Sequence, residues 1–145
     1  MTGYGITYSP YHNDGTCKTQ NDVNIDFAAI NGYTFVRIYN TDCNQVVTVN
    51  STATAKGMKL FVGINDITQV SSGVQTIIAA NCLKNIDTVA VGNEGINSGV
   101  YSVQAVVSAI STARSMLKNA GYTGRVVTVD TAVANHRISI ALSEL

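Results

Sequence analysis

The run from Thr34 to Tyr39, TFVRIY, predicts the fold together with four runs of the same kind. Each run is short, rich in β-branched or aromatic residues and followed by polar or glycine-containing sequence, which is typical of a buried strand. The others are GYGITY at Gly3 to Tyr8, KLFVGI at Lys59 to Ile64, TVAV at Thr88 to Val91 and RVVTV at Arg125 to Val129. Their centres lie about 25 to 38 residues apart, which suits a βα unit, so we expect parallel strands.

The segments between these runs show helical periodicity. The longest helix candidate extends from about Ser102 to Asn119, with apolar residues at spacings of three and four, and Gly121 stands where a helix C-terminus is expected. Strands that alternate with helices predict an α/β architecture with a parallel sheet. Functional side chains should then gather at the carboxyl ends of the strands.

Two architectures remain open on this evidence. An open, doubly wound sheet of five strands suits 145 residues, whereas a complete (β/α)8 barrel typically needs about 250. The glycine motifs that cradle nucleotide phosphates in open sheets are missing, because Gly3-Tyr4-Gly5 lacks a suitably placed third glycine and no G-x-x-x-x-G-K-[ST] occurs. Length favours the open sheet, and motif content does not support its usual chemistry.

Composition and charge exclude several classes of function. Nine Lys plus Arg balance nine Asp plus Glu, so there is no global field to attract nucleic acid or anionic membrane. The chain has no apolar run of the roughly 18 to 20 residues that cross a bilayer. His12 and His136 are isolated, and the three cysteines form no C-x-x-C pair. We therefore expect no cofactor, no metal, no nucleic-acid partner and no membrane partner.

The sharpest chemical signal is Glu94, which follows the fourth predicted strand directly in Val91-Gly92-Asn93-Glu94. A carboxyl at the end of a buried strand is partly desolvated, which raises its pKa toward the range of a general acid. Asn93 beside it would then hydrogen-bond a substrate hydroxyl. The alternative is that the Asn-Glu pair only begins a loop and caps the following helix.

Other polar residues follow the predicted strands. Arg37 and Tyr39 alternate with apolar residues and so share one face of their strand, which would be the interior of a closed barrel. A buried arginine needs a partner, either in a structural ion pair or in holding a catalytic carboxylate. Asp42, Asp66 and Asp130 follow three further strand ends, as rim acids or as helix N-caps.

Tyrosines cluster at the first two strands. Tyr4, Tyr8, Tyr11, Tyr33 and Tyr39 fall in or beside them, and Tyr8 and Tyr11 approach the carboxyl end of the first. Flat rings with a polar edge suit stacking against sugar rings, although core packing is the commoner use.

Seven motifs occur in order along the chain: GITYSPY at Gly5–Tyr11, NDGTCK at Asn13–Lys18, VRIY at Val36–Tyr39, DCN at Asp42–Asn44, LFVGI at Leu60–Ile64, VGNE at Val91–Glu94 and VTVDT at Val127–Thr131. Together they resemble fungal members of glycoside hydrolase family 17, which include soluble cell-wall proteins of yeasts. The resemblance implies a (β/α)8 barrel, here about its first five βα units over residues 1–131, followed by an unrelated tail at 132–145.

The resemblance also implies a retaining glycoside hydrolase that acts on β-1,3-glucan of the fungal cell wall, by hydrolysis or by transfer. It assigns the general acid/base role to Glu94. With it we expect substrate contacts from Asn93, Tyr39 and Arg37, and, from their places at the strand ends, from Tyr8 and Asp130. The protein is then expected to be secreted or in the cell wall, and Cys17 and Cys43, which match cysteines of these secreted proteins, are expected to form a disulfide.

The chain departs from this family in one important respect. The family's second carboxylate is a glutamate in a Thr-Glu-Thr-Gly-Trp type motif, and the chain has neither that motif nor any tryptophan. No secretion leader precedes Gly3. We expect an incomplete barrel that is inactive by itself and self-associates through open barrel edges. The alternatives are a non-catalytic glucan-binding or cell-wall structural protein, and an unrelated five-stranded open-sheet binding domain.

Overall fold

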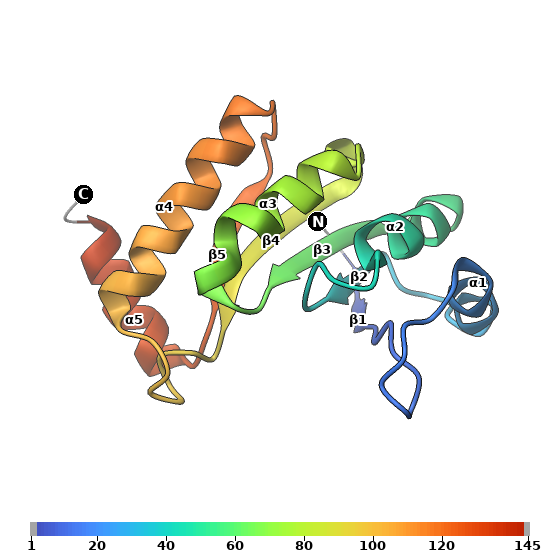
Figure 1. The fold of residues 1–145 in the computed structure, drawn as a ribbon, viewed down its shortest axis with the longest axis horizontal. Coiled ribbons are helices and arrows are strands. Elements are labelled where there is room, and N and C mark those ends of the chain that lie inside the picture. The colour runs from blue at the N-terminus through green and yellow to red at the C-terminus, as the bar shows by residue number, and fades with distance from the viewer. Residues whose placement is uncertain (1–2, 144–145) are drawn as a thin grey trace.

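The computed structural model describes residues 3–143 and shows one parallel sheet. Its strands are β1 Gly5–Thr7, β2 Phe35–Ile38, β3 Lys59–Ile64, β4 Ile86–Asn93 and β5 Arg125–Val129. They lie side by side in chain order, and every neighbouring pair is parallel (Figure 1). The predicted α/β class and parallel sheet are confirmed.

A helix follows each strand. The helices are α1 Gln20–Ala28, α2 Gln45–Ala55, α3 Val70–Ala79, α4 Val103–Asn119 and α5 Ala132–Ser143, with short 3-10 turns η1 Ile67–Gln69 and η2 Leu83–Asn85. The candidate from Ser102 to Asn119 corresponds to α4, and the Ser102 hydroxyl caps it by accepting a hydrogen bond from the backbone N–H of Ala105. The fold is therefore a regular series of βα units.

The strand order decides between the two architectures. A doubly wound sheet reverses its strand order at a switch point, whereas a barrel adds each new strand on the same side. Here the order runs β1-β2-β3-β4-β5 without reversal, and Figure 1 shows α1 to α5 following one another across the molecule in the same order. The open-sheet alternative is wrong, and the chain forms part of a (β/α)8 barrel.

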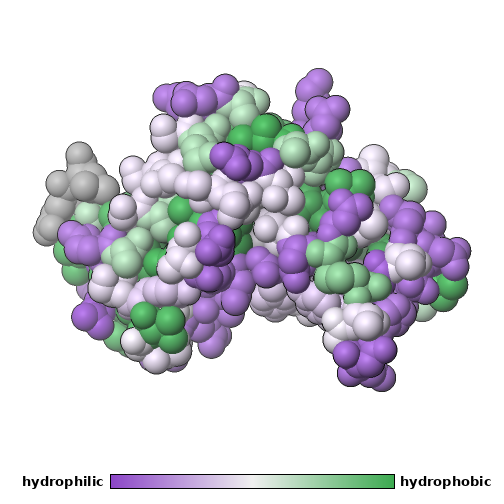
Figure 2. Space-filling view, viewed as in Figure 1, coloured by the Kyte–Doolittle hydropathy of each residue, from purple (hydrophilic) through white to green (hydrophobic). Residues whose placement is uncertain are grey.

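One face of the sheet is sealed by the helices. On β2, Val36 and Ile38 are fully buried, whereas Phe35 and Arg37, which point the other way, are only partly covered. On the side of the molecule where α3 lies in front of the sheet, Figure 2 shows the hydrophobic residues in separate small patches among polar ones, which is ordinary for a solvent-facing surface.

The opposite face corresponds to the barrel interior. A hollow of about 370 Å³ lies on it, lined by Phe35, Phe61, Val127 and their neighbours. Strands β1 and β5 each pair on one side only within the described residues. Unpaired strand edges favour association, and self-association through them stays a prediction.

The segment predicted as an unrelated tail contains α5, which packs on α4 and buries Ala134 and Ile138. Residues 144 and 145 of that segment lie outside the described part of the chain. The division of the chain at Thr131 stays a prediction.

A disulfide joins Cys17 in the loop after β1 to Cys43 in the loop after β2, with the two Cα atoms 5.4 Å apart. The pairing implied by the resemblance is confirmed. Cys82 is free and half-buried, and burial raises the pKa of its thiol. The bridge holds two loops together at the carboxyl ends of adjacent strands.

Replacing Cys17 and Cys43 together with serine should lower the free energy of unfolding by about 3 kcal/mol, because the bridge closes a loop spanning 26 residues in the unfolded chain. Urea unfolding followed by circular dichroism measures the change. Cys82→Ser is the control and should unfold at nearly the parent midpoint. Equal midpoints for the double variant and the control would show that the bridge does not stabilise the fold.

Candidate active site

The centre of the candidate site is a contact between β2 and β4. Arg37 Nη2 donates a hydrogen bond to Asn93 Oδ1 at 2.9 Å. The guanidinium carbon lies 4.4 Å from the ring centroid of Tyr39 and 5.2 Å from that of Phe61, so the cation is held against two aromatic rings. Arg37 Nε is buried and has no hydrogen-bond partner among the described residues. The partner of Arg37 is thus an amide, and neither predicted ion-pair role is seen.

The position of Tyr39 depends on a glycine in the neighbouring strand. A Cβ atom at Gly63 on β3 would lie 2.6 Å from the carbonyl oxygen of Tyr39, which is closer than real Cβ contacts allow. Only glycine lets the end of β2 approach β3 this closely. Tyr39 keeps 40% of its surface exposed, and its ring remains accessible beside Arg37.

The end of β4 is bent around Asn93. Gly92 has a φ of +80° and Glu94 a φ of 51°, and the pairing with β5 shifts register between Ala90 and Asn93. The backbone N–H of Glu94 donates to the carbonyl of Val129 at 2.8 Å. A left-handed conformation is costly for a residue with a Cβ, and such strain is found preferentially at functional sites.

Glu94 is an exposed residue, and its carboxylate accepts no hydrogen bond from the described residues. Only the Glu94 backbone is engaged, its carbonyl accepting from the N–H of Ser98 at 3.0 Å. Helix α4 begins later, with Ser102 as its cap, so the prediction that the Asn-Glu pair caps this helix is wrong. The carboxylate is free to meet a ligand.

The loop from Glu94 to Ser102 is held by aspartates on two sides. From the end of β5, Asp130 accepts hydrogen bonds from the backbone N–H groups of Ile96 at 3.0 Å and Asn97 at 3.3 Å. From the end of β3, Asp66 accepts from the Tyr101 hydroxyl at 3.0 Å. Hydrogen bonds from Thr68 and Tyr101 hold the pKa of Asp66 below its usual range. Both carboxylates therefore position the segment that carries Glu94.

The third aspartate at a strand end is Asp42. It accepts a hydrogen bond from the Tyr11 hydroxyl at 2.7 Å and one from Gln45 Nε2 at 2.6 Å. Burial, followed by the bond to Asp42, raises the pKa of Tyr11. Asp42, Asp66 and Asp130 thus each bind groups within the protein. Asp66 is also the N-cap of η1, as the N-cap alternative anticipated.

Tyr8 makes its ring contact and its hydroxyl hydrogen bond with α1, and it also lines a hollow together with Tyr39. Its ring is 7% exposed and packs edge-on against Phe27 of α1 with centroids 5.0 Å apart. Its hydroxyl donates to Asp26 at 2.6 Å, and Lys18 Nζ reaches the same carboxylate at 2.8 Å. Hydrogen bonds from Lys18 and Tyr8 lower the pKa of Asp26. Most of Tyr8 serves the core under β1.

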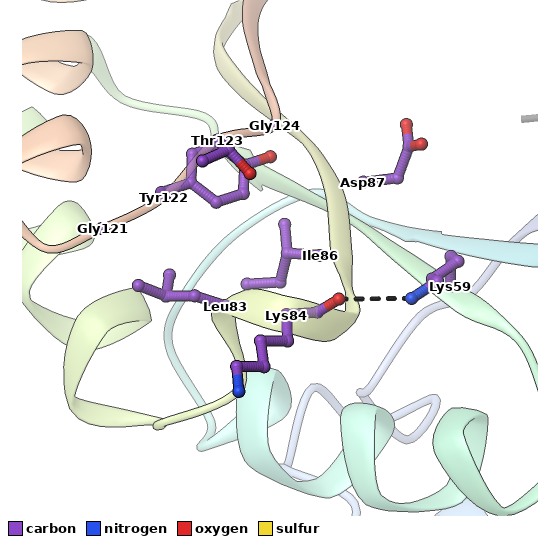
Figure 3. A pocket seen from close by; sticks show the side chains of 9 residues that line it. All are labelled: Lys59, Leu83, Lys84, Ile86, Asp87, Gly121, Tyr122, Thr123 and Gly124. Atoms are coloured by element: carbon purple, nitrogen blue, oxygen red, sulfur yellow. Dashed lines mark hydrogen bonds between the residues drawn. The ribbon is translucent and has the colours of Figure 1, made fainter.

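A second hollow, of about 260 Å³, lies at the other end of the sheet (Figure 3). It opens at the amino ends of β3 and β4, where Lys59 Nζ donates to the carbonyl of Lys84 at 3.2 Å. Burial raises the pKa of Tyr122 in its wall to about 12. In barrels of this class the amino face serves stability, so we do not place the active site there.

Residues 3–143 contain no cluster of three or more histidine, cysteine or acidic side chains that would hold a metal ion. No helix in that part of the chain is long and apolar enough to cross a membrane.

Comparisons with known proteins show which family this chain belongs to. The profile of the BtgE/BtgC glycoside hydrolase domain matches residues 5–143. The chain is 42% identical over 134 residues to the probable family 17 glucosidase SCW10 of Saccharomyces cerevisiae, covering 90% of this chain and 34% of that protein. It is 38% identical over 134 residues to the cell surface mannoprotein MP65 of Candida albicans, covering 35% of that protein.

A solved structure shows the same fold. An active-site mutant of Rhizomucor miehei β-1,3-glucanosyltransferase in complex with laminaritriose superposes with a TM-score of 0.74 at 25% identity, covering 89% of this chain and 50% of that one. The fold and these likenesses place the chain in a glycoside hydrolase family of the barrel class. The chain belongs to the BtgE/BtgC glycoside hydrolase domain family, and it spans about a third of the length of SCW10 and of the related family 17 glucosidase SCW4 of Saccharomyces cerevisiae.

Sequence reasoning missed three residues that organise this region. Phe61 alternates with Leu60 and Val62 on β3, so the strand period places it on the inner face. No sequence pattern indicated that its ring would be the second one against the Arg37 guanidinium. Tyr101 and Gln45 lie outside the strands, and no local pattern indicated their contacts with Asp66 and Asp42.

Asp130→Ala should loosen the loop that carries Glu94, because two backbone N–H groups lose a charged acceptor. Amide exchange of Ile96 and Asn97 should become about tenfold faster or more, measured by hydrogen exchange and NMR. Asp14→Ala is the control, since Asp14 bonds only Thr16 in an exposed turn. Unchanged exchange at Ile96 and Asn97 would show that Asp130 does not hold the loop.

Glu94→Gly should be more stable than Glu94→Ala by about 1 kcal/mol, because glycine adopts the left-handed conformation without a Cβ penalty. Glu94→Asn should fall between them. Midpoints of urea unfolding give the order. Alanine equal to or above glycine would mean that the backbone at Glu94 relaxes when its side chain is removed.

Proposed function

We propose that this chain supplies the acid/base half of a retaining glycoside hydrolase site that acts on β-1,3-glucan. The observation that carries the proposal is that Glu94 is exposed and its carboxylate is free. The neighbouring Asn93 is held by a 2.9 Å hydrogen bond from Arg37. The names of similar proteins support it: a family 17 glucosidase, and a β-1,3-glucanosyltransferase that binds laminaritriose.

In the proposed mechanism Glu94 protonates the glycosidic oxygen as the bond breaks. Its carboxylate then removes a proton from an incoming water, for hydrolysis, or from a sugar hydroxyl, for transfer. Asn93 would contact the sugar beside the reacting carbon, and Tyr39 would offer its exposed ring to a sugar face. Asp130 would act through the Glu94 loop, and Tyr8 through the packing of β1.

A retaining reaction also needs a second carboxylate about 5 to 5.5 Å from the first as the nucleophile. Glu94 is the only glutamate among residues 3–143, and the neighbouring Asp66 and Asp130 already bind the loop. We therefore propose that the 145 residues alone bind glucan but turn it over poorly, since losing a covalent nucleophile costs many orders of magnitude in rate. Names of relatives such as cell surface mannoprotein support a location at the cell surface.

The same absence of a second free carboxylate favours one other function. The chain would then be a non-catalytic glucan-binding protein that keeps the Asn93 and Tyr39 contacts. The two candidate functions differ in whether Glu94 can act as a general acid. A small carboxylate added to the solution can replace the missing nucleophile, so that the activity of Glu94 can be measured.

Added formate should allow the parent chain to form products, and Glu94→Gln should abolish this product formation. The parent chain, Glu94→Gln and Glu94→Asp are incubated with a β-1,3-linked glucose oligosaccharide, with and without formate as the missing nucleophile, and products are read by mass spectrometry. We expect products with formate in the parent, at least tenfold fewer in Glu94→Asp and none in Glu94→Gln. Equal products in all three would remove Glu94 from the mechanism. Binding without products in any of them would favour the non-catalytic function.

A further inference from the structure

A small hollow lies between the carboxyl ends of β1 and β2, beside the contact between Arg37 and Asn93. Its volume is about 130 Å³, and its walls include Pro10, Tyr11, Tyr39 and Gln45. The Cys17–Cys43 disulfide ties together the two loops that form these walls. The hollow is therefore part of a covalently braced surface.

Gln45 carries an unmet hydrogen-bonding requirement at this hollow. The residue is wholly buried at the first turn of α2, and its Nε2 donates to Asp42 Oδ1 at 2.6 Å. Because a carboxylate only accepts hydrogen bonds, this contact fixes which end of the amide is the nitrogen. Gln45 Oε1 is buried and has no partner among the described residues. A buried carbonyl oxygen requires a donor, and the hollow that Gln45 lines is where a donor would enter.

The lining defines the class of ligand. No lysine or arginine lines the hollow, and the Asp42 carboxylate lies directly behind Gln45, so an anion would find no countercharge. Aromatic walls from Tyr11 and Tyr39 with a carbonyl acceptor suit a neutral molecule that has an apolar face and hydroxyl donors. The volume equals that of about four water molecules, so it accepts the edge of one sugar unit and not a whole oligosaccharide.

A continuous path of contacts links the hollow to the candidate active site. The Tyr39 ring that lines it lies 4.4 Å from the guanidinium of Arg37, and Arg37 bonds Asn93 at 2.9 Å. We propose that the hollow is a binding subsite for one glucosyl unit of the β-1,3-glucan chain, with a sugar hydroxyl donating to Gln45 Oε1. This inference rests on the proposed function and adds to it a second point of contact.

The test measures binding of laminaritriose to the full chain by calorimetry. Gln45→Met removes the acceptor with little change in volume, and it should raise Kd about tenfold. Ser9→Leu fills the hollow from its exposed rim without touching Gln45, and it should give a similar loss. Gln75→Met makes the same chemical change on the exposed side of α3 and should leave Kd unchanged. Circular dichroism confirms that each variant is folded, and Ser9→Leu decides the test if Gln45→Met does not fold.

The outcomes separate this inference from the proposed function. Weaker binding in Gln45→Met and Ser9→Leu, with Gln75→Met at the parent value, supports the subsite. Parent affinity in both hollow variants would mean that the hollow holds only water, which overturns the subsite while the glucan function stands. No binding of laminaritriose by the parent chain would overturn the subsite and glucan binding by this chain together.

Discussion

The guanidinium of Arg37 ties the two strands that matter most for this site. It reaches from β2 past β3 to Asn93 at the end of β4, and the rings of Tyr39 and Phe61 hold it in place. The arrangement depends on the parallel pairing of β2, β3 and β4 in chain order, which brings their carboxyl ends to one edge. A cation among apolar strands would be costly without these partners, and the same partners make it a rigid support for Asn93.

The backbone beyond Asn93 shows how the fold holds a strained segment at the candidate site. The left-handed conformations at Gly92 and Glu94 turn the chain out of β4, and they persist because Asp66 and Asp130 over-determine the loop that follows. Two carboxylates are thus committed to hydrogen bonds within the protein, while the Glu94 carboxylate stays exposed. Fixed neighbours around one free acid are what a proton-transfer site requires.

Sequence patterns predicted much of this arrangement. The period of two on β2 correctly placed Arg37 and Tyr39 on one face, opposite Val36 and Ile38. The pattern failed where the partner comes from a distant element. The rim aspartates bind loop groups about 30 residues away, as Asp130 does with Ile96, and the Tyr8 hydroxyl binds Asp26 on the first helix. Such pairings depend on three-dimensional contacts that no local spacing encodes.

The order of residues alone was enough for the alternation of strands and helices, the parallel sheet and the position of Glu94 after the fourth strand, because these follow from side-chain period and chain connectivity. The motifs, read as a resemblance, also indicated the barrel family and the Cys17–Cys43 pairing. Only the folded molecule decided that Arg37 binds Asn93, that Asp130 holds a loop, and that Gln45 is buried beside an open hollow. The physical reason is that strand identity is a short-range property, whereas the partner of a polar side chain is set by which distant elements pack beside it.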